Sequence, residues 1–281
     1  MSDRIVLVTG ATGRQGGAVA RSLVGKGFKL RGMTRKPEGE PAKALKVLGI
    51  EVVRADLDDA DSVAKALDGA WGVFAVQNTW EAGVEREEQQ GKRLAELARS
   101  KGVQHFVYSS VASAHRKTGI PHFDNKWRVE EVVRRLKFPS HAILRPVFFM
   151  ENLFTPSFLM GDRLVAALKP TTPLQMVAVD DIGRVGARLF TDSEELEGRE
   201  IDLGGDSATM VQAAQALSRG LSKPIRFVEI PIAEVRKNSE DVARMLEWFE
   251  RVGYNADIPA LEREFGKLTK LEEWAARAVH A

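Results

Sequence analysis

The sequence predicts an α/β fold with a doubly wound parallel sheet, followed by a smaller α+β region. Short β-rich runs alternate with segments of helical period through the first half of the chain, which indicates βαβ units. A glycine-rich loop directly follows the first run, and the alternation ends after Asn152. We therefore expect a Rossmann domain over residues 1–153 and a smaller C-terminal substrate or partner domain over residues 154–281, with segment 175–205 a candidate for packing back on the Rossmann sheet.

The first half contains six predicted strands, each four to eight residues long and bounded by turn or helix signals. They are Ile5–Thr9, Lys29–Thr34, Glu51–Ala55, Gly72–Val76, His105–Ser109 and His141–Pro146. Apolar residues recur at helical spacing between them. The predicted helices are Gly17–Gly25, Pro41–Leu48, Asp59–Leu67, Val84–Ser100 and Phe123–Leu136.

The second half has a less regular pattern, with helices and strands mixed. Its predicted helices are Phe154–Leu168, Ile182–Phe190, Met210–Ser218, Ala233–Val252 and Lys270–Val279. Its predicted strands are Gln175–Val179, Glu200–Leu203 and Ile225–Glu229. We find no internal repeat and no low-complexity linker.

Composition narrows the function classes. The 281 residues are 44% hydrophobic and carry a formal net charge of +2, so no basic footprint for direct nucleic-acid binding is expected. The absence of cysteine excludes disulfides and thiolate chemistry. The five histidines have no metal-ligand spacing, which predicts no metal site. With neither a signal peptide nor a long apolar run, we expect a cytoplasmic protein that does not enter membranes.

The loop after the first strand has the glycine spacing of a dinucleotide-binding turn. Gly10 would let the chain turn out of the strand, Gly13 would let backbone amides approach a pyrophosphate, and Gly16 would allow close packing of the helix. Amides at a helix N-terminus hold anions well. Because the pattern follows a strand and opens an apolar-periodic helix, it predicts a phosphate site.

The end of the second strand indicates which dinucleotide binds. NAD-binding domains place an acidic residue there for the ribose 2′-hydroxyl, whereas this strand ends in Thr34, Arg35 and Lys36. Arg35 can hold a 2′-phosphate in its planar fork, and Lys36 and Arg14 add positive charge. We therefore predict NADP(H) as the cofactor.

Polar residues also follow the third and fourth strands. Asp56 is expected either near the adenine or as the N-cap of the next helix, and Gln77 and Asn78 near the ribose and nicotinamide. The run Glu85–Glu88 is interpreted as a solvated helix face. The predicted cofactor-binding residues of these loops are Gly10, Thr12, Gly13, Arg14, Gln15, Gly16, Thr34, Arg35, Lys36, Asp56, Leu57, Gln77 and Asn78.

Several motifs together resemble one family. The segments GATGRQGG, TRKP, VFAVQNTWE, HFDNKWRVEEVVR and LRPVFFMENL are similar to those of NmrA-like proteins, a branch of the atypical short-chain dehydrogenase/reductases. The resemblance runs from residue 4 to about 190 and continues more weakly to the end. It implies either an NADP(H)-binding redox sensor with a protein partner or an NADPH-dependent reductase of quinone-like substrates.

The resemblance also shows a departure. Active short-chain dehydrogenases carry a tyrosine four residues before a lysine, and here the pair is His122 and Lys126. Lys126 is expected to bind the nicotinamide ribose, or to act as a general acid if burial lowers its pKa. His122 is either a proton donor or an ordinary surface or capping residue. Ser109 and Ser110 end the fifth strand, where the family's catalytic serine often lies, or serve as a helix cap.

The stretch after the sixth strand completes the predicted site. The resemblance places Phe149, Met150 and Asn152 against the nicotinamide, although alternation puts one of Phe148 and Phe149 in the core. The missing tyrosine favours the sensor over the reductase of small quinone-like or unsaturated carbonyl substrates. Sequence leaves the substrate, the partner and the oligomeric state open.

Overall fold

The computed structural model describes residues 4–278, which form two compact units. The first unit contains residues 4–114, 122–145 and 182–201, and the second contains 115–121, 146–181 and 202–278. Compared with the division expected at residue 153, residues 115–121 and 146–153 fall in the second unit and residues 182–201 fall in the first.

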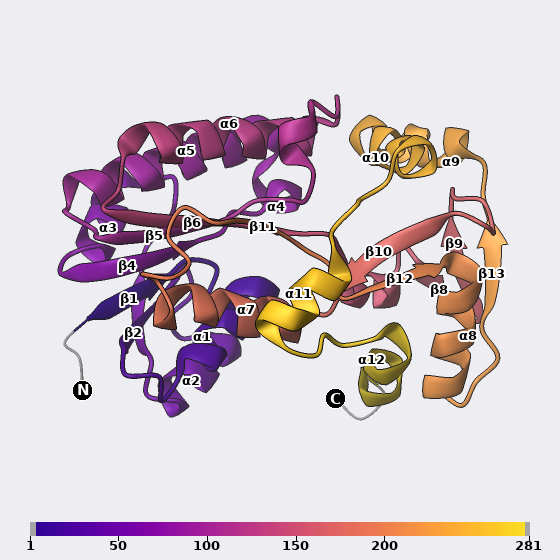
Figure 1. The fold of residues 1–281 in the computed structure, drawn as a ribbon, viewed down its shortest axis with the longest axis horizontal. Coiled ribbons are helices and arrows are strands. Elements are labelled where there is room, and N and C mark those ends of the chain that lie inside the picture. Colours follow the sequence, from indigo (N-terminus) through magenta and orange to yellow (C-terminus); the bar gives the residue numbers. More distant parts are fainter. Residues whose placement is uncertain (1–3, 279–281) are drawn as a thin grey trace. The chain divides into compact units, whose positions relative to one another are not determined.

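The first unit is built on a seven-stranded sheet with the order β11-β6-β5-β4-β1-β2-β3 (Figure 1). Its strands are β1 Ile5–Val8, β2 Lys29–Thr34, β3 Glu51–Arg54, β4 Ala70–Ala75, β5 His105–Ser109, β6 Ser140–Pro146 and β11 Glu200–Leu203. The pairings among β1 to β6 are parallel. The amides of Ile143 and Val147 donate to the carbonyls of Arg199 and Leu203. Both partners advance by four residues in the same direction, so β11 also runs parallel to β6. The predicted doubly wound fold is confirmed.

Helices cover both faces of this sheet (Figure 1). One face carries α3 Ala60–Ala66, α5 Val84–Ser100 and α6 Pro121–Leu136. The other carries α1 Arg14–Leu23, α2 Glu40–Val47 and α7 Val179–Thr191. Glycine permits the close packing of α7 on α1, since a Cβ at Gly183 would lie 2.7 Å from the carbonyl oxygen of Ala18. Large apolar side chains of the central strands, among them Phe74 and Phe106, are completely buried.

A buried ion cluster fixes α6 over the edge of the sheet. Glu130 of α6 is fully buried and accepts bonds from Arg145 of β6 at 2.8 and 2.6 Å. Arg145 also reaches Glu200 of β11 at 2.5 Å. Breaking one partner of such a cluster would leave a charge buried without compensation, so the arrangement is strongly determined. It therefore determines where the start of α6, with Lys126, lies relative to the strands.

The second unit contains two three-stranded sheets and several helices. One sheet has the order β12-β10-β7 and the other β13-β9-β8. The strands are β7 Phe148–Phe149, β8 Leu159–Met160, β9 Arg163–Ala166, β10 Pro173–Val177, β12 Asp206–Thr209 and β13 Arg226–Glu229. The helices are α8 Met210–Gly220, α9 Ile232–Asn238, α10 Glu240–Arg251, α11 Ile258–Phe265 and α12 Leu271–Ala278. Short 3-10 turns occupy Ala114–Arg116 and Met150–Phe154.

Several predictions for this half were wrong. Residues 154–168 do not form a helix, because Gly161 turns the chain with φ of +68° and lets β8 pair with β9. The helix expected over 233–252 is interrupted at Ser239, whose side chain instead caps α10 by accepting from the amide of Val242 at 3.2 Å. Helix α11 and strand β12 were missed. Residue 279, expected to end the last helix, lies outside the described residues.

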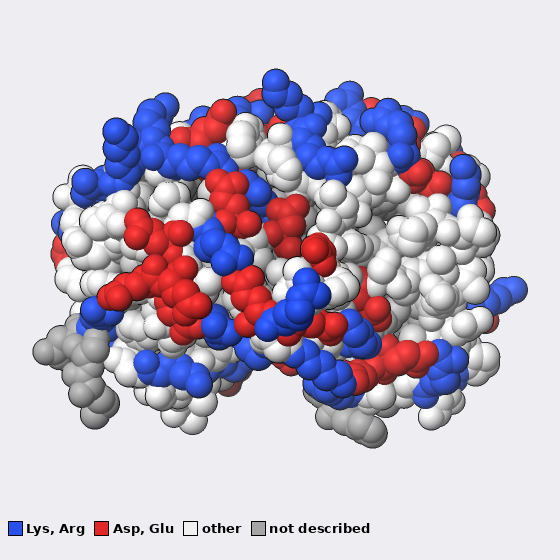
Figure 2. Space-filling model, in the orientation of Figure 1, with Lys and Arg blue, Asp and Glu red and all other residues white. Residues whose placement is uncertain are grey.

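No helix within residues 4–278 is long and apolar enough to cross a membrane. On the face shown in Figure 2, basic and acidic side chains are interspersed rather than gathered into one area of a single sign. The whole chain is also close to charge balance, with 41 basic and 39 acidic residues.

Candidate functional site

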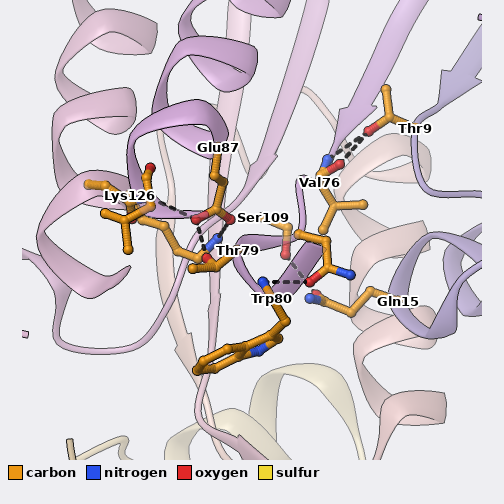
Figure 3. A network of polar contacts seen from close by, with 11 residues as sticks. Thr9, Gln15, Val76, Thr79, Trp80, Glu87, Ser109 and Lys126 are labelled. Carbon is orange, nitrogen blue, oxygen red and sulfur yellow. Dashed lines mark hydrogen bonds and ion pairs between the residues drawn. The ribbon is translucent and has the colours of Figure 1, made fainter. Parts of the chain in front are cut away.

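The phosphate loop, residues 10–16, leaves the end of β1 through a turn that requires glycine at its first position. Gly10 has φ of +58°, the left-handed region that glycine adopts without steric cost. Just before it, the Thr9 hydroxyl donates to the carbonyl of Val76 at 2.9 Å and accepts from its amide at 2.8 Å (Figure 3). The loop is therefore anchored to the end of β4 as well as to β1.

The two later glycines of the loop have different physical roles. A Cβ at Gly16 would lie 2.4 Å from the carbonyl oxygens of Thr9 and Gly10, so the packing of the loop itself requires glycine there. A Cβ at Gly13 would meet only the Gly10 carbonyl oxygen, at 3.2 Å, and this residue is exposed. The glycine at position 13 therefore keeps open the space in front of the helix.

The N-terminus of α1 suits an anion. The helix begins at Arg14, three residues earlier than expected, with Gly13 as an N-cap that makes no side-chain bond and no acidic residue in the first turn. In any α-helix the first amides cannot bond within the helix and are available to other acceptors. A pyrophosphate fits this cradle of backbone donors, small residues and helix dipole.

Ser109 of β5 contacts the phosphate loop at Gln15. Its hydroxyl donates to the Gln15 side-chain oxygen at 2.7 Å, and the residue is 1% exposed (Figure 3). Ser110, which follows it, is also buried, and its hydroxyl has no partner among the described residues. Ser109 therefore orders the first turn of α1, a role that the sequence alone did not indicate.

The end of β2 presents two exposed cations. Thr34 Oγ1 lies 3.4 Å from Thr12 Oγ1 and accepts from the amide of Lys36 at 3.2 Å, which shapes the turn. Arg35 is half exposed and forms an ion pair with Glu81. This hydrogen bond is the main cause of a raised Arg35 pKa. Glu81 belongs to α4, Thr79–Ala82, a short helix that sequence analysis missed.

The loop after β3 corrects one alternative. Asp59, and not Asp56, is the N-cap of α3, accepting from the amides of Asp61 and Ser62. Asp56 instead accepts from the amide of Asp58 at 3.0 Å. The N-cap interpretation of Asp56 was therefore wrong, while its expected place beside an adenine stays a prediction.

The same loop is fastened to α5. The Leu57 carbonyl accepts from Arg93 at 2.9 Å, and Asp58 contacts Arg86 at 2.5 Å and Gln90 at 3.0 Å. These bonds hold Leu57 and Asp56 at the carboxyl edge of the sheet.

The end of β4 contains an unusual buried amide. Gln77 is 7% exposed, and neither its amide nitrogen nor its side-chain oxygen has a partner among the described residues. Asn78, directly after it, is exposed and caps α4 by accepting from the amide of Trp80 at 3.1 Å. Because buried polar groups normally have partners, Gln77 is the best-defined candidate here for contact with water or a ligand.

A buried carboxylate organises the other end of the site. Glu87 of α5 is 1% exposed and forms an ion pair with Lys126, which is 12% exposed (Figure 3). It also accepts from Asn125 at 2.8 Å and from the Thr79 hydroxyl. We call these four residues the Glu87 cluster. The interpretation of residues 85–88 as a wholly solvated face was wrong for Glu87, since helical spacing turns it inward with Gln90 and Gly91.

The ionisation of Glu87 follows from its partners. Burial alone would raise the pKa of the carboxyl group, but the charge of Lys126 and hydrogen bonds from Lys126, Thr79 and Asn125 outweigh it. The pKa is therefore lowered, and Glu87 is a carboxylate at neutral pH. The ion pair thereby fixes the position of the Lys126 side chain on α6.

His122 lies one turn before Lys126 on α6 and is 6% exposed, so the interpretation as a surface residue was wrong. Its ring packs 5.1 Å from the ring of Trp80, which is itself 65% exposed. Neither tyrosine replaces it. Tyr108 is buried within β5, where burial raises its pKa far above the usual value, and Tyr254 packs 5.0 Å from Phe249 in the second unit.

The remaining predicted residues belong to the second unit. Phe148 is buried and Phe149 is half-buried, which confirms that alternation places one of the pair in the core. Met150 is completely buried, and the Asn152 carbonyl accepts from Thr155 at 2.7 Å. Their contact with a nicotinamide stays a prediction. Among residues 4–278, no group of three or more histidine, aspartate or glutamate side chains could hold a metal ion.

The fold and the phosphate loop together define a Rossmann-type dinucleotide-binding class. Residues 2–275 match the NmrA-like family, and the chain belongs to it. An NmrA-like family domain-containing protein of Dictyostelium discoideum is 28% identical, with 96% of each chain covered. The NmrA-like oxidoreductase FrzB of Cladobotryum sp is 35% identical over 53% of this chain, which spans 47% of that relative.

Solved structures share the fold. NmrA, a negative transcriptional regulator, has been solved in complex with NADP, and it superposes with a TM-score of 0.80 at 22% identity, covering 100% of this chain and 96% of its own. NmrA has also been solved with NAD. The Citrobacter sp. triphenylmethane reductase complexed with NADP(H) gives a TM-score of 0.81 at 20% identity, covering 98% and 99%.

Proposed function

We propose that this protein binds NADP(H) and acts as a redox sensor or regulator that responds to NADP(H) occupancy. The observation that carries the cofactor assignment is the open, uncapped N-terminus of α1 behind Gly13, together with a β2 end that presents Arg35 and Lys36. At the position where active short-chain dehydrogenases carry a tyrosine, this chain has His122, packed beside Trp80. The absence of that tyrosine favours regulation over ordinary alcohol dehydrogenation.

Each end of the ligand has residues to hold it in this proposal. The amides of residues 12–16 bind the pyrophosphate, Arg35 and Lys36 bind the 2′-phosphate, and Asp56 and Leu57 border the adenine. Gln77, Asn78 and Lys126 contact the ribose and nicotinamide. When bound, NADP(H) supplies hydride-transfer chemistry. The NADP-bound regulator NmrA supports the assignment.

A second function, NADPH-dependent reduction of a small quinone-like or unsaturated carbonyl substrate, is favoured by the Glu87 cluster. Burying a carboxylate costs free energy. Here the buried carboxylate of Glu87 holds the side chain of Lys126 in place. Such a fixed ammonium can orient a ribose hydroxyl or donate a proton to a substrate oxygen. The relatives named as oxidoreductases support this alternative.

The cofactor assignment is tested by Arg35→Ala. Loss of a bond to a charged group should weaken NADP(H) binding by about 1.5–3 kcal/mol and leave NAD(H) nearly unchanged. Titration calorimetry with both cofactors measures it. Arg226→Ala, an exposed arginine of β13, is the matched control and should change neither affinity. Equal affinity of the native protein for NADP(H) and NAD(H) would refute the assignment.

A measurement of NADPH turnover distinguishes the proposed regulator from the proposed reductase. NADPH oxidation is followed at 340 nm with a panel of quinones and aldehydes. Sustained oxidation that depends on one compound would make the protein a reductase. Binding without oxidation across the panel is the outcome that the sensor proposal expects.

A further inference from the structure

The guanidinium that is proposed to hold the 2′-phosphate already has an anionic partner in the first unit. Arg35 pairs with Glu81, and the two side chains are 53% and 54% exposed. The acid that NAD-binding domains carry at the end of β2 is absent from that strand. A carboxylate nevertheless reaches the same place, because α4 brings Glu81 to it from beyond the end of β4.

Other acids near Arg35 are engaged elsewhere. Asp58 contacts Arg86 and Gln90, and Asp56 accepts from the amide of Asp58. Both act on Arg35 only through their charge, whereas Glu81 contacts it directly. Glu81 is thus the group that an incoming phosphate would have to replace on the guanidinium.

We propose that Glu81 is a specificity-determining residue that competes with the cofactor 2′-phosphate for Arg35. This inference rests on the proposed function, namely that NADP(H) binds with its 2′-phosphate at Arg35. A ligand with a 2′-phosphate must separate Arg35 from Glu81, while a ligand with a 2′-hydroxyl leaves the pair intact. The Arg35–Glu81 contact lowers the preference for NADP(H) over NAD(H). Separation of Glu81 from Arg35 then occurs only when NADP(H) binds, so it can signal that this cofactor is present.

The same short helix connects this signal to the other end of the site. Within four residues, α4 carries Glu81, the exposed Trp80 beside His122, and Thr79, which donates to Glu87 of the cluster (Figure 3). Its ends are set by the Asn78 cap and by Gly83 with φ of +84°. Releasing Glu81 therefore removes the tether of α4 on the β2 side and changes the surroundings of Trp80.

Binding of two small nucleotides tests the competition. Adenosine 2′,5′-bisphosphate carries the 2′-phosphate, and ADP lacks it. Calorimetry of the native protein, Glu81→Gln and the control Glu85→Gln should show about two- to five-fold tighter binding of the bisphosphate in Glu81→Gln alone, the size expected for an exposed ion pair. ADP affinity should be equal in all three. Glu85 is an exposed acid of α5, so its variant makes the same change in net charge.

The outcomes separate this inference from the function it rests on. If the native protein prefers the bisphosphate but Glu81→Gln binds it no more tightly than Glu85→Gln does, competition by Glu81 is refuted while NADP(H) binding stands. If Arg35→Ala binds the bisphosphate as tightly as the native protein does, the proposed cofactor assignment itself fails. In an Arg35→Ala background, Glu81→Gln should change bisphosphate affinity less than in the native background; an undiminished effect would refute competition for that arginine.

Tryptophan fluorescence gives a second readout. The bisphosphate should change the emission of the native protein, and Trp80→Phe should lose that change. ADP should produce little of it. An equal Trp80 signal from ADP would overturn the role of Glu81 release, because α4 would then respond to any adenine nucleotide.

Discussion

The two ends of the candidate site in the first unit differ in whether backbone or side-chain groups form them. The phosphate loop is made of backbone, with glycines that keep side chains away from the N-terminus of α1. The Glu87 cluster is made of side chains from α4, α5 and α6, with a buried carboxylate at its centre. A backbone site needs only local spacing, whereas a side-chain site needs several elements to be placed correctly at once.

This difference predicts different responses to substitution. At the phosphate loop, a change that fills the open space should remove binding and leave the fold intact. At the Glu87 cluster, a change should first reduce the stability of the protein, because an uncompensated charge is then left buried. Separate measurements of stability and of binding can therefore test this contrast.

The largest expected effect is that of Glu87→Ala. Removing the carboxylate leaves Lys126, Asn125 and Thr79 without their common acceptor, and breaking a buried pair in this way typically costs about 3–5 kcal/mol of unfolding free energy. Urea unfolding at neutral pH measures it. Glu85→Ala on the exposed side of the same helix should cost less than about 0.5 kcal/mol. Similar losses in both variants would show that the cluster does not stabilise the fold.

The pH dependence has a defined sign. Because the folded-state pKa of Glu87 is lowered, its contribution is complete above the ordinary carboxyl pKa and is lost as the pH falls through the lowered value. The stability difference between the native protein and Glu87→Gln should therefore shrink on acidification. A constant difference would show that the charge of Glu87 is not what matters.

The next largest effect is expected at the phosphate loop. Gly13→Val should place a branched side chain in the open space in front of α1, and NADP(H) binding should weaken by at least about a hundred-fold, or 2.7 kcal/mol. Calorimetry measures the affinity, and urea unfolding should show a smaller change than for Gly16→Val. At position 16 a Cβ would collide with two carbonyl oxygens, so the fold itself should suffer. Normal NADPH binding by Gly13→Val would show that the loop is not the phosphate site.

The contrast also explains how much could be predicted from the sequence. The glycine spacing and the cationic end of β2 were visible because they lie within a few residues of a strand with a clear pattern. Glu87 was misinterpreted because its neighbours in sequence are charged and exposed, and only the approach of α6 and α4 gives it partners. Glu81 was missed for a similar reason, since a four-residue helix has too little length to show a period.

The second unit was harder to predict for another reason. Residues 159–166 were expected to be helical. They form strands because β9 pairs in parallel with β13, which lies some sixty residues later in the chain. Ser239 interrupts an otherwise continuous helical pattern by serving as a cap. In both places a tertiary contact or a single side-chain bond overrides the local pattern, and neither is visible from periodicity alone.

Among the substitutions in the phosphate loop and the Glu87 cluster, the smallest expected effect is on cofactor affinity in Lys126→Met, and it decides what the cluster is for. If Lys126 only holds the ribose, the NADPH dissociation constant should rise about ten-fold, worth about 1.4 kcal/mol, and any turnover should recover at saturating NADPH. If Lys126 donates a proton, turnover should stay depressed by ~10²–10⁴ at saturation. Calorimetry and steady-state rates separate these results, and His122→Ala run in parallel tells whether the neighbouring ring carries the proton instead.

The structure makes a matched control necessary for this variant. Lys126→Met alone leaves Glu87 charged and buried without its cation, so a loss of binding could reflect a distorted cluster. The double variant Glu87→Gln with Lys126→Met removes both charges and keeps an acceptor for Asn125 and Thr79. Its stability should lie closer to that of the native protein than either single variant does. We expect it to show the same ten-fold weaker NADPH binding, because the ribose contact belongs to Lys126 itself. Native affinity in the double variant would instead show that Lys126 serves only to neutralise Glu87.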